Sequence, residues 1–124
     1  MNDKKNPVGW FEIYVQDMDR AKAFYEKVFK VTLQPLASPG MHLLAFPMAS
    51  DAPGCAGALV RMEGRESGGG TMIYFTCEDC AVEAERAAQN GGSVFKGKFS
   101  IGEYGFIALV IDPEGNMIGL HSRQ

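Results

Sequence analysis

The sequence is poor in the features that mark disulfide-stapled, membrane-spanning or nucleic-acid-binding proteins. Its three cysteines are an odd number and too few for a disulfide framework, which indicates a reducing compartment. No apolar run approaches the roughly 18 residues of a membrane span, and residues 1–7 lack the apolar core of a signal peptide. The net charge is −3, without a dense cluster of Lys and Arg. We therefore expect a cytoplasmic protein that binds neither membranes nor nucleic acids.

What the sequence does contain is a near repeat at half of its length. Asp17 and Asp79 lie 62 positions apart (79 − 17) in a chain of 124 residues. Each aspartate ends an alternating apolar strand and opens an amphipathic helix. With 46% apolar residues the chain can bury about two thirds of its unfolded surface without a staple. We expect a single domain, built from two similar halves that share a cavity.

The first half is predicted to run over about residues 7–62. Residues 8–15 alternate, with Phe11 and Ile13 on one face, which is typical of a strand. A helix follows from a cap at Asp17 or Asp19 to about Lys30, because apolar residues recur there at three- and four-residue spacing. Three further strands are expected over residues 31–36, 41–46 and 57–62.

The second half is predicted to run over about residues 71–122, after a Gly-rich linker at 63–70. It repeats the order of the first half, with a strand at 71–77 and a helix from Asp79 to the Gly91-Gly92 stop. Strands then follow at 93–95, 105–111 and 117–121, the last two joined by a tight hairpin of sequence DPEGN. Each half therefore has the order βαβββ, and the predicted fold class is α+β.

These segments resemble the vicinal oxygen chelate (VOC) superfamily, which includes glyoxalase I, bleomycin-resistance proteins and extradiol dioxygenases. The resemblance depends on WFEIYVQDMDRAKAFYEKVF at 10–29, on SIGEYGFIALVIDPEGNMIGLHS at 100–122 and on the repeat, and it covers nearly the whole chain. It implies two βαβββ modules that form a half-open barrel around a cup, commonly in homodimers. In metal-dependent members, His or Glu at four cup-facing strand positions holds a divalent ion.

The positions that this resemblance assigns to metal ligands carry other chemistry here. They are Trp10, Met72, a position near residues 57–59 and Gly119. Divalent metals in this class need nitrogen or oxygen donors in a defined geometry. We expect no cofactor and no metal at the usual site, which argues against glyoxalase-type isomerisation.

Strand alternation selects the candidate ligand-binding residues, because apolar walls with a few convergent polar groups are typical of small-molecule pockets. Glu12 would either contact the ligand or form a structural hydrogen bond with a donor such as Tyr74 or His121, since an isolated buried carboxylate is costly. Trp10 would either stack on a flat ligand or fill the cavity. The predicted set is Trp10, Glu12, Tyr14, Met72, Tyr74, Thr76, Glu103, Met117 and His121, with His42 as a further candidate.

Two groups of residues have both a functional and a structural interpretation. Glu12, His121 and Glu103 could form an atypical three-ligand zinc site, although lone histidines near a chain end are usually surface residues. Cys77 and Cys80 form a C-x-x-C motif where a helix N-terminus can lower a thiol pKa. Two carboxylates lie between these thiols, and both fall on faces expected to pack internally, so small buried apolar side chains are the simpler interpretation.

The sequence leaves three functions open. The preferred one is a metal-free, bleomycin-resistance-like protein that binds a small organic molecule in the cup. The second is a glyoxalase-related lyase or isomerase that uses Glu12 as a general base, with an atypical metal site or none. The third is a module whose groove is occupied by a partner protein.

Overall fold

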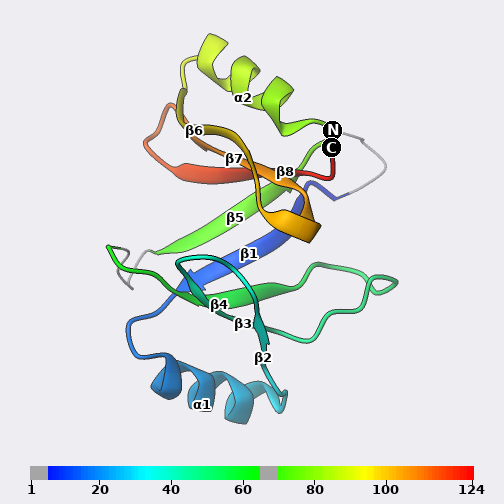
Figure 1. Ribbon diagram of the computed structural model, residues 1–124, viewed down its shortest axis with the longest axis vertical. Coiled ribbons are helices and arrows are strands. Elements are labelled where there is room, and N and C mark those ends of the chain that lie inside the picture. The colour runs from blue at the N-terminus through cyan, green and yellow to red at the C-terminus, as the bar shows by residue number, and fades with distance from the viewer. Residues whose placement is uncertain (1–5, 65–69) are drawn as a thin grey trace. The chain divides into compact units, whose positions relative to one another are not determined.

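The computed structural model describes residues 6–64 and 70–124, which form two compact units. The first unit contains the described residues of 10–71, and the second contains 72–124 together with the described residues before Trp10. In Figure 1 each unit is a small sheet with a helix beside it. Most of the predicted linker, residues 65–69, lies outside the described residues.

The first unit has the predicted βαβββ order. Its elements are β1 (Val8–Tyr14), α1 (Met18–Phe29), β2 (Gln34–Leu36), β3 (His42–Ala45) and β4 (Gly57–Arg61). The strands lie in the order β2-β3-β4-β1, with β1 parallel to β4 and the remaining pairs antiparallel. The strand predicted from residue 31 begins only at Gln34, because the backbone N–H of Leu33 donates to the Glu26 carboxylate of α1 (2.9 Å).

The helix α1 is bounded by local signals and packs on one face of this sheet. The Asp17 side chain accepts a hydrogen bond from the Arg20 backbone N–H (3.0 Å), and Lys30 ends the helix with a left-handed φ of 54°. The core of the unit consists of Val15, Met18, Leu33, Leu44 and Leu59, with Ile13, Ala21, Tyr25, Val31 and Phe46 packed against them. Since Ile13 faces α1, its neighbours Glu12 and Tyr14 point to the opposite side of β1.

The second unit repeats this order. Its elements are β5 (Thr71–Thr76), α2 (Cys80–Gln89), β6 (Ser93–Ser100), the 3₁₀ turn η1 (Gly102–Tyr104), β7 (Phe106–Ile111) and β8 (Met117–Ser122). The strands lie in the order β5-β8-β7-β6, with β5 parallel to β8. β6 is longer than predicted, because register shifts between Val94 and Lys96 and between Lys96 and Phe99 let an irregular sequence keep pairing with β7.

Two side chains cap the N-terminus of α2. Asp79 accepts from the Ala81 backbone N–H (3.0 Å) and from Lys98 Nζ (2.8 Å). The Ser122 hydroxyl accepts from the Cys80 backbone N–H (3.0 Å) and donates to the Gln124 carbonyl (2.9 Å). Ser122 is only 1% exposed, so β8 supplies a buried cap from 42 residues away along the chain.

The packing of α2 defines the two faces of the second sheet. The core consists of Cys77, Cys80, Ala84, Ala108, Val110 and Leu120, with Phe75, Ala87, Phe106 and Ile118 packed against them. Because Ile118, Leu120 and Ser122 face α2, Met117, Gly119 and His121 point away from it. The fold is thus α+β with two βαβββ modules, as predicted, whereas the cup between the modules stays a prediction. Neither α1 nor α2, the α-helices of the described segments, is long and apolar enough to cross a membrane.

Candidate functional site

Alternate side chains of β1 place two hydrogen-bond donors on one buried carboxylate. Trp10 Nε1 donates to Glu12 Oε2 (3.2 Å), and the Tyr14 hydroxyl donates to Glu12 Oε1 (3.1 Å). Glu12 is 8% exposed, and these bonds offset part of the cost of removing its carboxylate from water. We call Trp10, Glu12 and Tyr14 the β1 cluster. The register sets Glu12 beside Ala58 and Tyr14 beside Val60, so the adjacent strand β4 adds an apolar wall without donors.

In the second unit, the sheet face that points away from α2 carries most of the other predicted residues. β8 contributes Met117, Gly119 and His121, and the register brings Tyr74 beside Gly119 and Thr76 beside His121. On the other side of β8, β7 places Ile107 beside His121 and Leu109 beside Gly119. Thr76 is exposed, and Ile107, Leu109, Met117 and His121 are half-buried. We call Tyr74, Thr76, Ile107, Leu109, Met117 and His121 the β8 face.

A side chain at residue 119 would not fit, because the Tyr74 ring occupies the space into which it would project. A Cβ at residue 119 would overlap the ring, and even the more distant Tyr74 Cγ would lie only 2.8 Å away. Tyr74 is 7% exposed, and its Cγ is joined to the backbone through Cβ alone, so this ring atom cannot move far from its position. A larger residue at 119, a carboxylate included, is therefore incompatible with Tyr74 in this position.

His121 forms a hydrogen bond within its own unit. Its predicted pairing with Glu12, a residue of the other unit, stays a prediction. The Nε2 of His121 lies 2.6 Å from the Tyr104 carbonyl oxygen at the end of η1. A carbonyl oxygen can only accept, so this contact requires a proton on Nε2. Glu103 lies in η1 and is exposed, so it is close to this anchor in sequence but does not belong to the β8 face.

The residues at the positions implied by the resemblance do not fit a divalent metal. The indole N–H of Trp10 donates to Glu12, Met72 offers a buried thioether, Ala58 is apolar, and the Tyr74 ring lies on Gly119. Within 6–64 and 70–124, no group of three His, Cys, Asp or Glu side chains is arranged to hold a metal ion. The atypical site of Glu12, His121 and Glu103 would need residues of both units, and it stays a prediction.

The remaining candidates have structural positions. Burial, followed by the Glu83 carboxylate, raises the pKa of the Cys77 thiol to about 11. Cys80 is 0% exposed in the α2 core, so both cysteines match the structural interpretation of the C-x-x-C motif. His42 lies two residues before Leu44 on β3, so the two side chains point to the same face of the sheet. Leu44 packs toward α1, and His42 therefore lies on the opposite side of the sheet from the β1 cluster.

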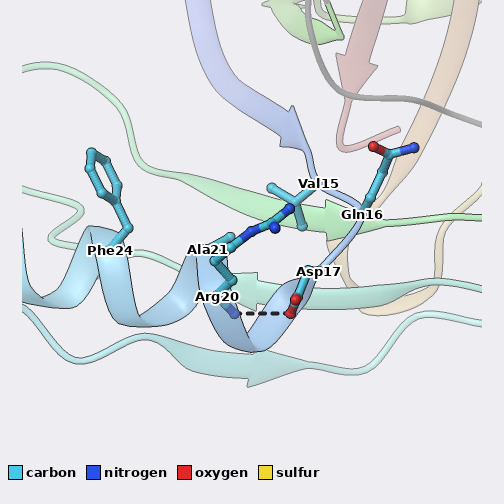
Figure 2. A pocket seen from close by; sticks show the side chains of 6 residues that line it. All are labelled: Val15, Gln16, Asp17, Arg20, Ala21 and Phe24. Atoms are coloured by element: carbon cyan, nitrogen blue, oxygen red, sulfur yellow. Dashed lines mark hydrogen bonds between the residues drawn. The ribbon is translucent and has the colours of Figure 1, made fainter.

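A depression of about 310 Å³ lies where β1 joins α1, and the sequence analysis did not anticipate it. Figure 2 shows its lining side chains and the hydrogen bond between Asp17 and the Arg20 backbone. The Gln16 carbonyl accepts a hydrogen bond from Arg61 Nε (3.0 Å). Two polar groups of the depression, the Asp17 carboxylate and the Gln16 carbonyl, are therefore already used to stabilise the helix and the turn. The lining residues are Val15, Gln16, Asp17, Arg20, Ala21 and Phe24.

The predicted site residues thus form two groups, each assembled within one unit. Trp10, Glu12 and Tyr14 are joined by hydrogen bonds on β1. Tyr74, Thr76, Met117 and His121 share one sheet face in the second unit. Met72 is 2% exposed and continues this side of β5 two residues before Tyr74. Tyr104 was missed as a site residue, and Gly119 was named only as an implied metal position. No local pattern marks the roles of these two residues, because the roles depend on contacts between distant segments.

Comparison with known proteins gives one family match. The family model of the Glyoxalase/Bleomycin resistance protein/Dioxygenase superfamily matches residues 8–120. Among curated proteins, none matches the chain by sequence.

Similar solved structures agree with the fold. A methylmalonyl-CoA epimerase variant from Streptomyces coelicolor, in complex with 2-nitronate-propionyl-CoA, has a TM-score of 0.70 at 16% identity and covers 93% of this chain and 95% of its own. A methylmalonyl-CoA epimerase from Mycobacterium tuberculosis has a TM-score of 0.67 at 14% identity, with 95% and 88% covered. A hypothetical protein from Bacillus halodurans C-125 has a TM-score of 0.70 at 14% identity, with 94% of each chain covered. At these identities the likeness concerns the fold alone.

Proposed function

Because the chain belongs to the Glyoxalase/Bleomycin resistance protein/Dioxygenase superfamily, we propose that it binds a small organic molecule without the help of a metal ion. The observation that carries the proposal is the composition of the β8 face. Three half-buried apolar side chains, Ile107, Leu109 and Met117, surround a small number of polar groups on a sheet face that no residue of α2 covers. Apolar surface with few polar groups is the usual lining of a small-molecule site.

The same proposal accounts for the residues that replace the metal ligands. The Tyr74 ring occupies the space at Gly119 where the resemblance implies a chelating side chain. An aromatic ring and aliphatic neighbours favour an apolar ligand through burial of surface, at about 25 cal/mol per Å². The ligand would therefore be held by contact area and a few hydrogen bonds.

A thermal-shift screen tests this function. Wild-type protein is heated with a library of small aromatic and aliphatic metabolites and, separately, with Zn²⁺, Ni²⁺ and Mn²⁺. A ligand at 100 times its Kd stabilises the folded state by about 2.7 kcal/mol, which is easily measured as a raised Tm. We expect organic hits that Leu109→Gln weakens and that Val82→Gln, a matched change on the exposed surface of α2, leaves unchanged. Stabilisation by metals alone would contradict the proposal.

A second candidate is an isomerase in which Glu12 moves a proton. It is favoured by the buried carboxylate of the β1 cluster and by the presence of methylmalonyl-CoA epimerases among the structural neighbours. Epimerisation removes a proton from the carbon next to a carbonyl and delivers a proton to the other face. A positioned carboxylate can remove the first proton and become a carboxylic acid, and a water molecule on the opposite face would supply the second and leave as hydroxide, which the carboxylic acid neutralises. Trp10 and Tyr14 would hold Glu12 in place for this step.

Isotope exchange separates the two candidates. Protein is incubated with methylmalonyl-CoA in D₂O, and the incorporation of deuterium at the α-carbon is followed by mass spectrometry. An isomerase would catalyse exchange, and Glu12→Gln would abolish it. Wild-type protein that catalyses no exchange would remove this substrate from consideration and leave the binding function.

The homodimer and the cytoplasmic location stay predictions. Three free cysteines are consistent with a reducing compartment. Size-exclusion chromatography with light scattering would measure the oligomeric state directly.

A further inference from the structure

We propose that His121 determines the ligand specificity of the β8 face, and that its Nδ1 accepts a hydrogen bond from a hydroxyl or N–H group of the ligand. The inference rests on the proposed small-molecule binding and extends it to one residue and one class of ligand. That class is a flat, apolar molecule with a single hydrogen-bond donor, such as a phenol.

The tautomer of His121 is the first step of the argument. Its Nε2 lies 2.6 Å from the Tyr104 carbonyl oxygen, and that oxygen has no proton to donate. The proton of the neutral ring must therefore be on Nε2, which leaves the lone pair on Nδ1. A neutral imidazole fixed in this form is a hydrogen-bond acceptor on its second nitrogen.

The backbone of η1 fixes the position of the Tyr104 carbonyl. The Ile101 N–H donates to the Gly105 carbonyl (2.9 Å), and the Gly105 N–H donates to the Gly102 carbonyl (3.1 Å). Gly105 has a φ of 104°, and a Cβ there would overlap the carbonyl oxygen of Ser122. The turn is thus closed on itself and lies directly against β8, so the acceptor that orients the imidazole belongs to a constrained backbone.

The neighbours of His121 define the rest of the ligand. Thr76 and Ile107 flank it in the two adjacent strands, and Tyr74 and Leu109 flank Gly119 two residues earlier. The aromatic and aliphatic members of this set favour a flat apolar body. A ligand that covers Nδ1 without offering it a donor removes this acceptor from water at a cost in free energy, so the site discriminates against ligands that lack a donor.

The first experiment tests the tautomer without any ligand. The chain has two histidines, His42 and His121, so a long-range proton–nitrogen NMR spectrum of nitrogen-15-labelled protein above neutral pH contains two ring systems. The variant His42→Gln assigns them. We expect His121 to have its proton on Nε2 and a lone-pair nitrogen at Nδ1. A proton on Nδ1, or exchange between both tautomers, would overturn the inference even if ligands bind.

The second experiment tests the ligand class with a matched pair of probes, 2-naphthol and 2-methoxynaphthalene, which differ in whether the oxygen carries a proton. Isothermal titration of wild-type protein should give a preference of about 3- to 10-fold for 2-naphthol, the factor that one ordinary hydrogen bond supplies. In His121→Leu this preference should fall to about one. His121→Gln should restore part of it, because the amide carries a donor and an acceptor on one carbon as the imidazole does. His42→Leu is the matched control and should retain the full preference.

The outcomes separate this inference from the proposed function. Binding of both probes with equal affinity by wild-type protein would overturn the role of His121 and retain the apolar site. A loss of affinity for both probes together in His121→Leu would mean that His121 only supports the fold, which also overturns it. Failure of wild-type protein to bind either probe would overturn the phenol-like class, and the metabolite screen would then decide whether the binding function survives.

Discussion

Addition of a single methyl group at Gly119 is expected to destabilise the second unit through the Tyr74 ring. A Cβ at this position would overlap ring carbons of Tyr74, and Tyr74 is 7% exposed. Overpacking of this kind costs about 1–3 kcal/mol. The loss of glycine's freedom in the unfolded chain opposes this by about 0.4–1 kcal/mol. The free energy of unfolding of Gly119→Ala should therefore fall by about 1.3 kcal/mol, the difference between the midpoints of the two ranges.

The measurement is urea unfolding followed by circular dichroism, with the free energy extrapolated to water. Gly97→Ala is the matched control, because Gly97 lies in β6 of the same sheet and a Cβ there would meet nothing within 4 Å. It should be neutral or slightly stabilising. Double variants test whether the Tyr74 ring is the cause. Gly119→Ala should stay destabilising when combined with Tyr74→Phe, which keeps the ring, and should lose most of its effect when combined with Tyr74→Leu.

Two results would refute this reasoning. Gly119→Ala could match Gly97→Ala, which would mean that the sheet accommodates the methyl group without cost. The penalty could also persist unchanged in the Tyr74→Leu background, which would place its cause outside the ring.

Three further outcomes are expected. Ser122→Ala should lower the free energy of unfolding by about 1–3 kcal/mol in urea titrations, because it leaves the buried Cys80 N–H unsatisfied. An effect below about 0.5 kcal/mol would show that this hydrogen bond contributes nothing. Hydrogen bonds from the Asn116 backbone and side chain and from other hairpin N–H groups hold the pKa of Asp112 below its usual value. The stability that Asp112 contributes should be complete above the ordinary carboxyl pKa and should disappear as the pH falls through the lowered pKa. The free energies of unfolding of wild type and Asp112→Ala should therefore become equal in acid, and a difference that grows there would contradict this. Since burial raises the pKa of Cys77 to about 11, a thiol reagent at about pH 8 should label Cys55 quickly in native protein, and equally fast labelling of Cys77 would contradict its burial.

Much of the architecture follows from local signals in the sequence. The positions of α1 and α2 could be predicted because Asp17 and Asp79 cap them with their own side chains, within three residues of the N–H groups they accept. The DPEGN hairpin is local for the same reason, since Asp112 accepts from the backbone of Glu114 and Asn116. Alternation along β1 placed Trp10, Glu12 and Tyr14 on one face, because the side-chain period of a strand is two.

The contacts that define the candidate site could not be read in this way. Alternation placed Tyr74 and His121 on one face but did not identify Gly119 or Tyr104 as their contacts. Only the register of β5 on β8 places the Tyr74 ring on Gly119, and only the return of η1 onto β8 brings the Tyr104 carbonyl to His121. The buried cap of α2 by Ser122 joins residues 42 positions apart.

The sequence by itself therefore determined which segments form strands and helices, the repeat of the βαβββ unit and the loss of chelating side chains at the implied metal positions. The tertiary structure decided which residues meet, namely the Tyr74 ring with Gly119, the His121 ring with the Tyr104 carbonyl and the Ser122 hydroxyl with the Cys80 N–H. The physical reason is range. Caps, turns and alternation act over a few residues of backbone, whereas strand register is fixed by the collective packing of an entire sheet, and no single segment encodes it.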